Sequence, residues 1–358
     1  MPPKTPEELW YAHTPEVGVR LARALLWPAS GLWWAGSNLH RGMYSLGMRQ
    51  AVTLAGVRVV KVGNVVTGGA GKTPTVMALA QAAVAAGLKP AILCRGYGAK
   101  PPPAGIRVGP DTPVALSGDE PLMMAGAMPE VPVYAGRDRV VLARAATAAG
   151  ATVLLLDDGM QHHRLGAQGL VAVVRGPDPF GNGLLLPAGP LREPAHALAR
   201  ADLVVVLEGT ADTLDRVNAA GVARERVVCA HLAPLDPVAL DGQGPLSLEG
   251  RRVVVAAGLA RPSRVVATVA GLGASVVHLV AWPDHAALGP AQVQAAQQAV
   301  TSHGANTLVM TEKDAVKWPR DTQLAGVRVV ALPVRLRWDT AAVPQAVLSL
   351  LGAAGLGQ

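Results

Sequence analysis

The strongest chemical signal in the chain is a glycine-rich segment that ends in lysine and threonine. Residues 61–74 read Lys-Val-Gly-Asn-Val-Val-Thr-Gly-Gly-Ala-Gly-Lys-Thr-Pro. A β-branched run leads into the segment and an apolar helical pattern follows it, which is typical of a P-loop. In that motif backbone N–H groups hold phosphates, the lysine (Lys72) reaches the β and γ phosphates, and the Thr73 hydroxyl binds Mg²⁺. Val66 stands where the strict motif has glycine, and a flexible glycine turn is the bland alternative.

A second polar cluster follows an apolar Val-Leu-Leu-Leu run. Asp157 and Asp158 come directly after the run, and Gln161, His162 and His163 follow closely. Ligands collect at the carboxyl ends of strands in open α/β sheets, and P-loop proteins use an Asp there to hold Mg²⁺. Either aspartate can serve. The structural alternative is a capping Asp-Gly turn with exposed histidines.

Two further carboxylates, Asp119 and Glu120, precede an apolar helical pattern. If the phosphoryl acceptor is a hydroxyl, it needs a base, and a carboxylate is the usual choice. One of the two could instead cap the helix, and the sequence leaves both interpretations open. His285, in a Trp-Pro-Asp-His turn, is a weaker candidate because polar turns look the same. The segment Thr-Glu-Lys-Asp at 311–314 resembles a nucleobase-binding pattern, but Glu312 interrupts it.

The elements that must position these residues alternate along the chain. Strands are expected at 57–62, 91–94, 153–156 and 171–174, with helices at 75–86 and 140–149. A second series of strands is expected at 203–207, 226–230, 253–257, 275–280, 307–310 and 327–331, with helices at 262–270 and 290–303. Such alternation favours parallel sheets covered by helices. We therefore expect an α/β fold, with a P-loop NTPase core with a parallel sheet at 51–200 and a second, smaller α/β domain at 201–358.

Residues 1–50 form a distinct N-terminal segment. Three of the seven tryptophans, Trp27, Trp33 and Trp34, lie within eight residues of one another, and arginines flank them. Pro28 is expected to break the helical pattern. Apolar residues with tryptophan and arginine suit a membrane interface, so we expect a membrane-associated helical segment. The alternative is an amphipathic helix packed on its own domain.

Composition narrows the classes of partner. The 358 residues carry a formal charge of +7, which suits a phosphorylated substrate or an anionic membrane surface. No basic run with interleaved aromatic residues is present, so nucleic acid is the weakest candidate. Two cysteines, Cys94 and Cys229, exclude a disulfide framework and a cysteine metal cluster. No apolar stretch reaches the length of a conventional membrane span.

Taken together, the motifs resemble one family, the tetraacyldisaccharide 4′-kinases, or lipid A 4′-kinases. The matching blocks occur in the family's order at 62–74, 95–98, 118–121, 157–162, 186–194, 283–285 and 311–315. Asp-Asp-Gly-Met-Gln-His and Pro-Ala-Gly-Pro-Leu-Arg-Glu are specific blocks, whereas a glycine loop alone would not be. The N-terminal segment also looks like the family's membrane-facing helix.

The resemblance implies transfer of the ATP γ-phosphate, with Mg²⁺, to the 4′-hydroxyl of a tetraacylated glucosamine disaccharide 1-phosphate. The product would be lipid IVA, a precursor of lipid A in lipopolysaccharide. The resemblance also implies two α/β/α domains joined by a hinge, with a cleft that closes around ATP. The implied localisation is the cytoplasmic face of the inner membrane, where the chain would be a peripheral or monotopic protein. No obligate protein partner and no nucleic acid are expected.

The resemblance also implies roles for individual residues. ATP would contact Thr67, Gly68, Gly69, Ala70, Gly71, Lys72, Thr73 and Pro74. Thr73 and Asp157 would hold Mg²⁺, and Asp119 would be the base, with His285 as its partner across the cleft. Further catalytic residues would be Lys72, Asp158 and Glu193, and substrate contacts would come from Asn64, Gln161, His162 and Arg192.

A different class of function remains open at this point. A membrane-associated P-loop switch NTPase, which acts by partner binding, has similar glycine-rich loops. Such a switch needs no base for an alcohol and no lipid pocket. Turnover of ATP only in the presence of a glycolipid acceptor would separate the two.

Overall fold

Two units, each built from separate segments of the chain, make up the computed structural model. The structure describes residues 5–12, 14–259, 261–319, 322 and 324–353. The first unit comprises Met1–Arg95, Asp138–His231 and Leu336–Gln358, and the second comprises Gly96–Arg137 and Leu232–Arg335. This division differs from the expected boundary at residue 200 in three respects. Residues 201–231 and residues 336–358 belong with the P-loop, and the segment that carries Asp119 does not.

A largely parallel sheet organises the first unit. Its strands, in spatial order, are β14 (Val334–Trp338), β8 (Val227–Pro234), β7 (Leu203–Leu207), β6 (Gly169–Arg175), β1 (Arg58–Gly63), β5 (Val153–Leu156) and β2 (Pro90–Cys94). From β2 to β8 every neighbouring pair is parallel. Because β7 pairs with β6 and β8 with β7, these two strands extend the first sheet. That pairing is why the expected boundary differs from the observed one.

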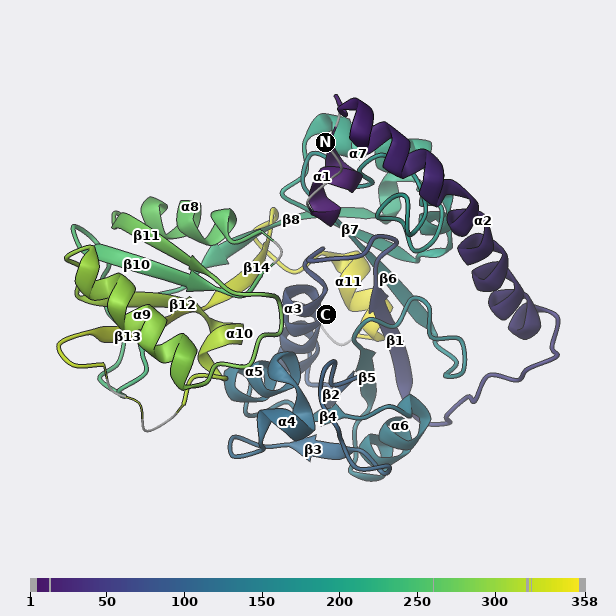
Figure 1. The fold of residues 1–358 in the computed structure, drawn as a ribbon. Helices are drawn as coiled ribbons and strands as arrows, with labels where there is room; N and C mark the ends of the chain where they lie inside the picture. Colours follow the sequence, from purple (N-terminus) through teal and green to yellow (C-terminus); the bar gives the residue numbers. More distant parts are fainter. Residues whose placement is uncertain (1–4, 13, 260, 320–321, 323, 354–358) are drawn as a thin grey trace. The chain divides into compact units, whose positions relative to one another are not determined.

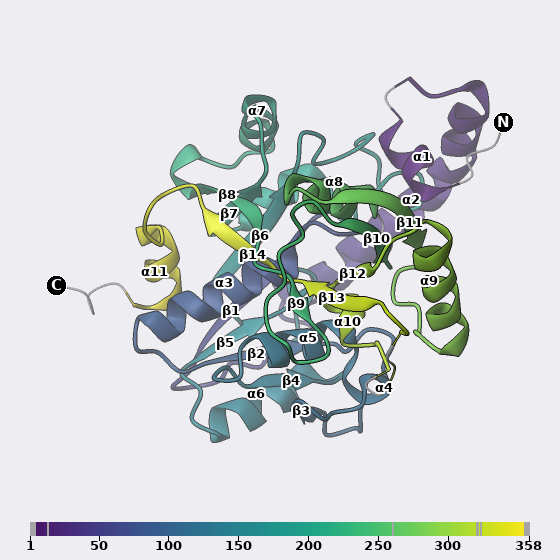
Figure 2. The ribbon, with the colours of Figure 1, turned by 90° about the vertical axis from the view of Figure 1, so that its left-hand side faces the viewer.

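Register within this sheet brings the predicted site segments to one edge. Lys61 of β1 lies opposite Leu156, the last residue of β5. The glycine-rich loop after β1 and the aspartates after β5 therefore leave the sheet side by side. Besides two N-terminal helices, this unit contains α3 (Lys72–Ala85), α6 (Arg139–Ala148), α7 (Ala211–Ala219) and α11 (Gln345–Leu351), with short turns η1 (Ala195–Arg200) and η2 (Arg224–Arg226). Figure 2 shows α3 running alongside β1 and α11 beside α3.

The second unit contains its own α/β sheet. The strand order is β11 (Ser275–Ala281), β10 (Arg252–Ala257), β12 (Thr307–Thr311), β13 (Arg328–Leu332) and β9 (Val238–Ala239), with only β9 antiparallel. The helix α8 (Ser263–Gly271) covers one face and α9 (Pro290–Ser302) the other (Figure 1), and each face has its own apolar core. The short helix α10 (Glu312–Ala315) follows β12 directly.

Residues 96–137 add a small antiparallel layer to the second unit. The strands β3 (Ile106–Val108) and β4 (Val133–Ala135) pair with each other, and α4 (Val114–Ser117) and α5 (Asp119–Ala127) contact them. The helix α5 also contacts α10. These contacts bring Asp119 to the same unit as His285.

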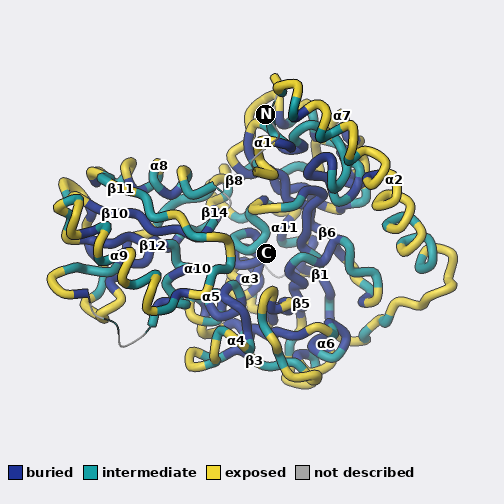
Figure 3. Tube along the Cα trace, viewed as in Figure 1, coloured by how far each residue is buried: buried dark blue, intermediate teal, exposed yellow. Residues whose placement is uncertain are grey.

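The N-terminal segment forms the short helix α1 (Pro6–Tyr11) and the long helix α2 (Val17–Ser45). The expectation that Pro28 breaks the helix is wrong, because α2 continues through it. Proline removes one hydrogen bond to the carbonyl of Ala24, and both residues are exposed, so water can take the place of the missing donor. Figure 3 shows α2 with long exposed stretches, in contrast to the buried strands. None of the described helices combines the length and apolar character that crossing a bilayer requires.

Candidate active site

The glycine-rich loop passes directly into α3. Gly71 precedes Lys72, the first residue of the helix, and has a φ of 88°. A Cβ at Gly71 would lie 2.3 Å from Leu207 Cδ1, so both backbone conformation and space favour glycine here. The first N–H groups of a helix have no partner within the helix and favour anions. The loop therefore has the geometry that a phosphate site requires.

A second loop, residues 184–194, braces the glycine-rich loop. The Thr67 N–H donates to Pro190 O at 2.8 Å, and the Arg192 N–H donates to Val65 O at 2.7 Å. Val66, where the strict motif has glycine, forms a bridge with Leu191 and lies in an apolar core. Burial against this loop explains the valine, because its side chain has an apolar partner.

Lys72, Asp158 and Arg192 form an ion-pair cluster beside the loop. Lys72 Nζ lies 3.3 Å from Asp158 Oδ1, and Arg192 Nη1 lies 2.9 Å from the same oxygen. Burial acts to raise the pKa of Asp158, but the charges of Lys72 and Arg192 outweigh it and hold this pKa below its usual value. Asp158 has a φ of 52°, a left-handed conformation that is uncommon for a non-glycine residue and common at functional sites.

Asn64, Gln161 and Glu193 form a hydrogen-bonded chain next to this cluster. Lys72 Nζ donates to Asn64 Oδ1 at 3.3 Å, and Asn64 is fully buried. Gln161 Nε2 lies within reach of Asn64 O at 3.1 Å and Glu193 Oε1 at 2.9 Å. Glu193 also accepts from Arg200. The structure thus brings four of the predicted residues, Lys72, Asn64, Gln161 and Glu193, into one network.

The expected magnesium ligands lie near the same loop. Thr73 follows Lys72 at the start of α3, and Asp157 follows β5 and is mostly buried. Hydroxyl and carboxylate oxygens are hard donors of the kind that Mg²⁺ prefers, together with water and substrate phosphates. Among the described residues no group of three or more His, Cys, Asp and Glu side chains forms a metal cage. The donor set therefore fits an ion held jointly by protein and nucleotide.

His162 and His163 are half-buried, not exposed as in a simple polar turn. Burial, together with neighbouring cations, lowers the pKa of each to about 4. Both imidazoles are therefore neutral near pH 7. The His163 ring lies 5.6 Å from the His40 ring and 5.7 Å from the Tyr44 ring, so α2 contacts this loop.

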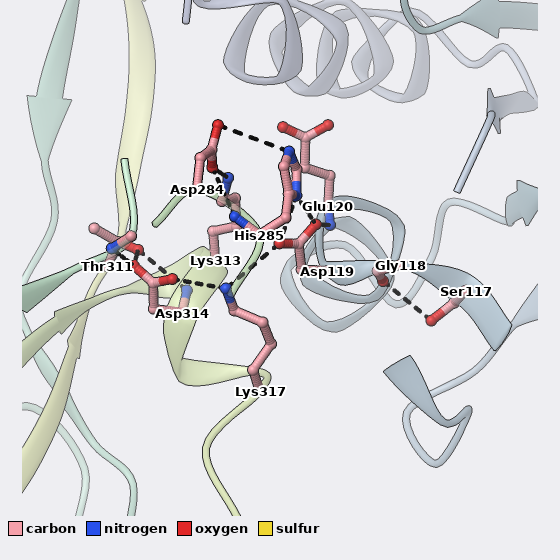
Figure 4. Close-up of polar contacts among 11 residues, drawn as sticks. Ser117, Gly118, Asp119, Glu120, Asp284, His285, Thr311, Lys313, Asp314 and Lys317 are labelled. Atoms are coloured by element: carbon pink, nitrogen blue, oxygen red, sulfur yellow. Dashed lines mark hydrogen bonds and ion pairs between the residues drawn. The ribbon is translucent and has the colours of Figure 1, made fainter. Parts of the chain in front are cut away.

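Asp119 and His285 form a hydrogen-bonded pair within the second unit (Figure 4). His285 Nδ1 lies 3.1 Å from Asp119 Oδ1 and 3.0 Å from Oδ2. The expected pairing is present, but the two residues belong to one unit, whereas we expected them on opposite sides of a cleft. The Tyr97 ring lies 5.1 Å from the His285 ring.

Local backbone geometry fixes both members of the pair. Asp119 is the first residue of α5, and its Oδ1 accepts from the Glu120 N–H at 2.9 Å as well as contacting His285, while the cap position is held by Gly118. Gly118, just before it, has a φ of 86° and a site for Cβ only 3.2 Å from Gly96 Cα, which favours glycine. His285 itself has a φ of 58°. A strained residue of this kind is typical of functional positions.

Hydrogen bonding and neighbouring charges offset the effect of burial on the pKa values of Asp119 and His285. Burial acts to raise the pKa of Asp119, but the hydrogen bond from His285 and the charges of Lys313 and Lys317 together hold this pKa below its usual value. The same hydrogen bond raises the pKa of His285. An ionised carboxylate accepts hydrogen bonds only, so His285 Nδ1 is the donor.

Sequence reasoning missed Lys317 and gave Lys313 and Asp314 no role beside Asp119. Lys313 Nζ contacts Asp284, and Lys317 Nζ lies 2.9 Å from Asp314 Oδ1. Asp314 and Thr311 hydrogen-bond to each other, so the 311–314 segment uses its polar groups to build α10. A cluster of charges directly after β12 was the available signal, because such charges at a strand end often serve a site.

Comparison with known proteins decides the family. The family model for tetraacyldisaccharide-1-P 4′-kinase (LpxK) matches residues 22–352. The chain belongs to the tetraacyldisaccharide 4′-kinase family. This confirms the resemblance predicted from the motifs, and the α/β class with its mostly parallel sheets agrees with a solved member.

Individual members of the tetraacyldisaccharide 4′-kinase family match most of the chain. A tetraacyldisaccharide 4′-kinase of Anaeromyxobacter sp. (strain Fw109-5) is 39% identical over 349 residues, which cover 92% of each chain. That of Rhodospirillum centenum is 40% identical over 334 residues, covering 92% of this chain and 91% of the relative. A crystal structure of “apo” form LpxK from Aquifex aeolicus in complex with ATP aligns with a TM-score of 0.69 and 27% identity, covering 89% of this chain and 95% of that chain.

Proposed function

We propose that the protein transfers the γ-phosphate of ATP to the 4′-hydroxyl of a tetraacylated glucosamine disaccharide 1-phosphate, and so makes lipid IVA. Membership of the 4′-kinase family and the ATP in the related LpxK crystal structure support this proposal. The structural observation that carries it is the cluster at the start of α3. There Lys72 lies 3.3 Å from Asp158 Oδ1, beside helix N–H groups with the geometry of a phosphate site.

The reaction forms one bond and breaks one. The 4′-oxygen of the sugar bonds to the γ-phosphorus, and the bond between this phosphorus and the β,γ-bridging oxygen breaks, which releases ADP. Asp119 accepts the hydroxyl proton, and His285 holds the carboxylate in place through its Nδ1. Phosphoryl transfer needs positioning and charge neutralisation more than covalent help from the protein.

Cations of the first unit supply that neutralisation. Lys72 contacts the β and γ phosphates, and residues 67–73 offer backbone N–H groups to them. Asp158 pairs with Lys72 and with Arg192, and so positions both cations, of which Arg192 contacts the substrate. Gln161 and Glu193 hold the loops around Asn64. Thr73 and Asp157 would hold Mg²⁺, which supplies positive charge that offsets the phosphate oxygens when it is bound.

The helix α2 is proposed to dock on the cytoplasmic face of the inner membrane. Large apolar residues on it are strongly exposed, among them Leu25 (80%), Leu32 (77%) and Leu39 (69%). Spacings of seven residues place these three on one side of the helix. Another part of α2 packs on the protein, since Ser30 Oγ donates to Leu185 O and Trp33 Nε1 to Arg192 O, each at 2.9 Å. The helix therefore packs on its own domain and also leaves an apolar stripe free for a lipid surface.

Dependence of ADP release on the lipid acceptor tests the proposal against a switch NTPase. The full chain is assayed in detergent micelles with ATP and Mg²⁺, with and without the acylated disaccharide 1-phosphate. We expect ADP release to rise with acceptor concentration and to equal the amount of phosphorylated lipid formed. Equal ADP release with and without acceptor, and no phosphorylated lipid, would overturn the proposal and favour the switch.

A further inference from the structure

A lysine outside the predicted set lies against the proposed base. Lys317 follows α10, and its side chain is only 6% exposed. Its Nζ lies 3.6 Å from Asp119 Oδ2 and 2.9 Å from Asp314 Oδ1 (Figure 4). A buried ammonium is costly unless carboxylates compensate it, so this placement depends on both partners.

Asp314 is a rigid anchor for this lysine. The residue is fully buried, and its Oδ2 accepts from the Gly258 N–H at 2.9 Å and from Thr311 Oγ1 at 2.7 Å. Oδ1 is thereby directed toward Lys317. The contacts link the end of β10, the start of α10 and Lys317 into one chain that ends at Asp119.

Other charges also face Asp119 and must be counted. The titratable or charged groups around it come from its own helix, from the loop after β11, and from α10 and its end. They are Glu120, Asp284, His285, Lys313, Asp314 and Lys317. Lys313 is already paired with Asp284, whereas Lys317 lies between Asp119 and a carboxylate that backbone contacts hold fixed.

We propose that Lys317 is a positioning residue that, anchored by Asp314, keeps Asp119 ionised and directed for proton transfer. The inference rests on the proposed function, because it assigns to Asp119 the role of base. Lys317 contacts the base and not the reacting atoms, so it acts through Asp119. The polar 311–314 segment then serves the acceptor side of the reaction and not a nucleobase.

The sign of the effect follows from the charges. The Lys317 ammonium favours the ionised form of Asp119, so its removal raises the pKa of this carboxyl. Activity that needs the carboxylate is lost as pH falls through that pKa, and the acid limb of kcat therefore moves to higher pH. Because Asp314 anchors Lys317 beside Asp119, Asp314→Asn is expected to move the acid limb in the same direction, by less than the loss of Lys317 itself.

The test compares pH profiles of kcat between pH 4 and pH 8 for wild type, Lys317→Met, Lys317→Arg and Asp314→Asn, with lipid phosphorylation as the readout. Lys89→Met, which changes an exposed lysine just before β2 in the first unit, is the matched control. We expect the acid limb of Lys317→Met to lie at higher pH than that of wild type, so that the variant loses a larger share of its activity as pH falls. Lys317→Arg should restore most of the wild-type profile, Asp314→Asn should shift the limb upward by less than Lys317→Met, and KM for ATP should change little.

Circular dichroism at each pH shows whether the variants stay folded, and unfolding temperature separates stability from charge. A purely structural role would lower activity by the same factor at every pH and would lower the unfolding temperature. A Lys317→Met pH profile with the wild-type shape would therefore overturn the inference. If Lys317→Met fails to fold, Lys317→Gln and Asp314→Asn carry the test, since both keep a polar group of similar size. Loss of lipid phosphorylation by wild type itself would count against the proposed function instead.

Discussion

Lys72 begins α3 and contacts both Asn64 and Asp158, so its ammonium is held at the phosphate loop before any nucleotide arrives. Because negative charge grows on the phosphate oxygens in the transition state, Lys72→Ala should lower kcat about 10²- to 10³-fold. Steady-state kinetics of lipid phosphorylation measure this effect. The variant Lys89→Ala, which changes an exposed lysine, should behave as wild type. Turnover by Lys72→Ala at the wild-type rate would remove the loop from the mechanism.

Asp119 and His285 should act as one unit, since the two side chains hydrogen-bond to each other and His285 is held with a φ of 58°. Asp119→Asn and His285→Ala are each expected to reduce kcat by about 10²- to 10⁴-fold, while ATP affinity is largely kept. The double variant should lose little beyond the more impaired single variant. Kinetic constants of all three, with ATP binding by calorimetry, measure the coupling. Fully multiplicative losses would argue against a dyad.

At the scale of elements, α2 presents an exposed apolar stripe while one side of it docks on residues 184–192. Leu25→Gln with Leu32→Gln should reduce binding to vesicles that contain anionic lipid, because it removes interfacial apolar area. The matched control is Leu235→Gln with Leu240→Gln, which changes two exposed leucines in the second unit. Co-sedimentation measures the bound fraction.

Both double variants should keep their activity on a short-chain soluble acceptor. Salt should weaken vesicle binding of the wild type only in part, since arginine contacts are screened and apolar contacts are not. If the α2 variant and the control pellet with vesicles equally, another surface meets the lipid.

Most strands and helices could be predicted from the sequence, because short apolar runs and helical periodicity are local signals. The strand at 153–156 and the helix beginning near residue 290 match the structure within a residue or two. The continuity of α2 through Pro28 could not be predicted, because it depends on the exposure of the freed carbonyl. The reason for valine at position 66 in the glycine-rich loop could not be predicted either, since its partner Leu191 lies far along the chain.

At the scale of the whole molecule, the unit to which a strand belongs depends on pairing between distant segments, which a local sequence pattern does not predict. Whether β7 belongs to the first sheet depends on its register with β6, and no local pattern records this. The predicted residues of the phosphate cluster did meet, because strand ends share one edge of a parallel sheet. Lys317 and Lys313 were missed because only the packing of α10 on α5 brings them to Asp119.

Stability of the whole protein should fall between pH 7 and pH 4 in part because of His162 and His163. Their folded pKa values of about 4 lie below the ordinary histidine value of 6.5. Between these values the unfolded chain binds more protons, so stability is full above about pH 6.5 and declines as pH falls toward 4. The double variant His162→Gln with His163→Gln should show a smaller drop in unfolding temperature from pH 7 to pH 5 than wild type. A drop as large as that of wild type in the double variant would contradict the burial argument.

The position of the phosphate on the product tests the central claim most directly. The full chain is incubated with ATP, Mg²⁺ and the tetraacyl disaccharide 1-phosphate in micelles, and the purified lipid is examined by ³¹P–¹H correlation NMR. The account predicts a new phosphomonoester coupled to the proton at the 4′ position, with the 1-phosphate unchanged, and no such signal from Lys72→Ala. A phosphate at any other position, or an unmodified lipid beside ADP, would contradict it.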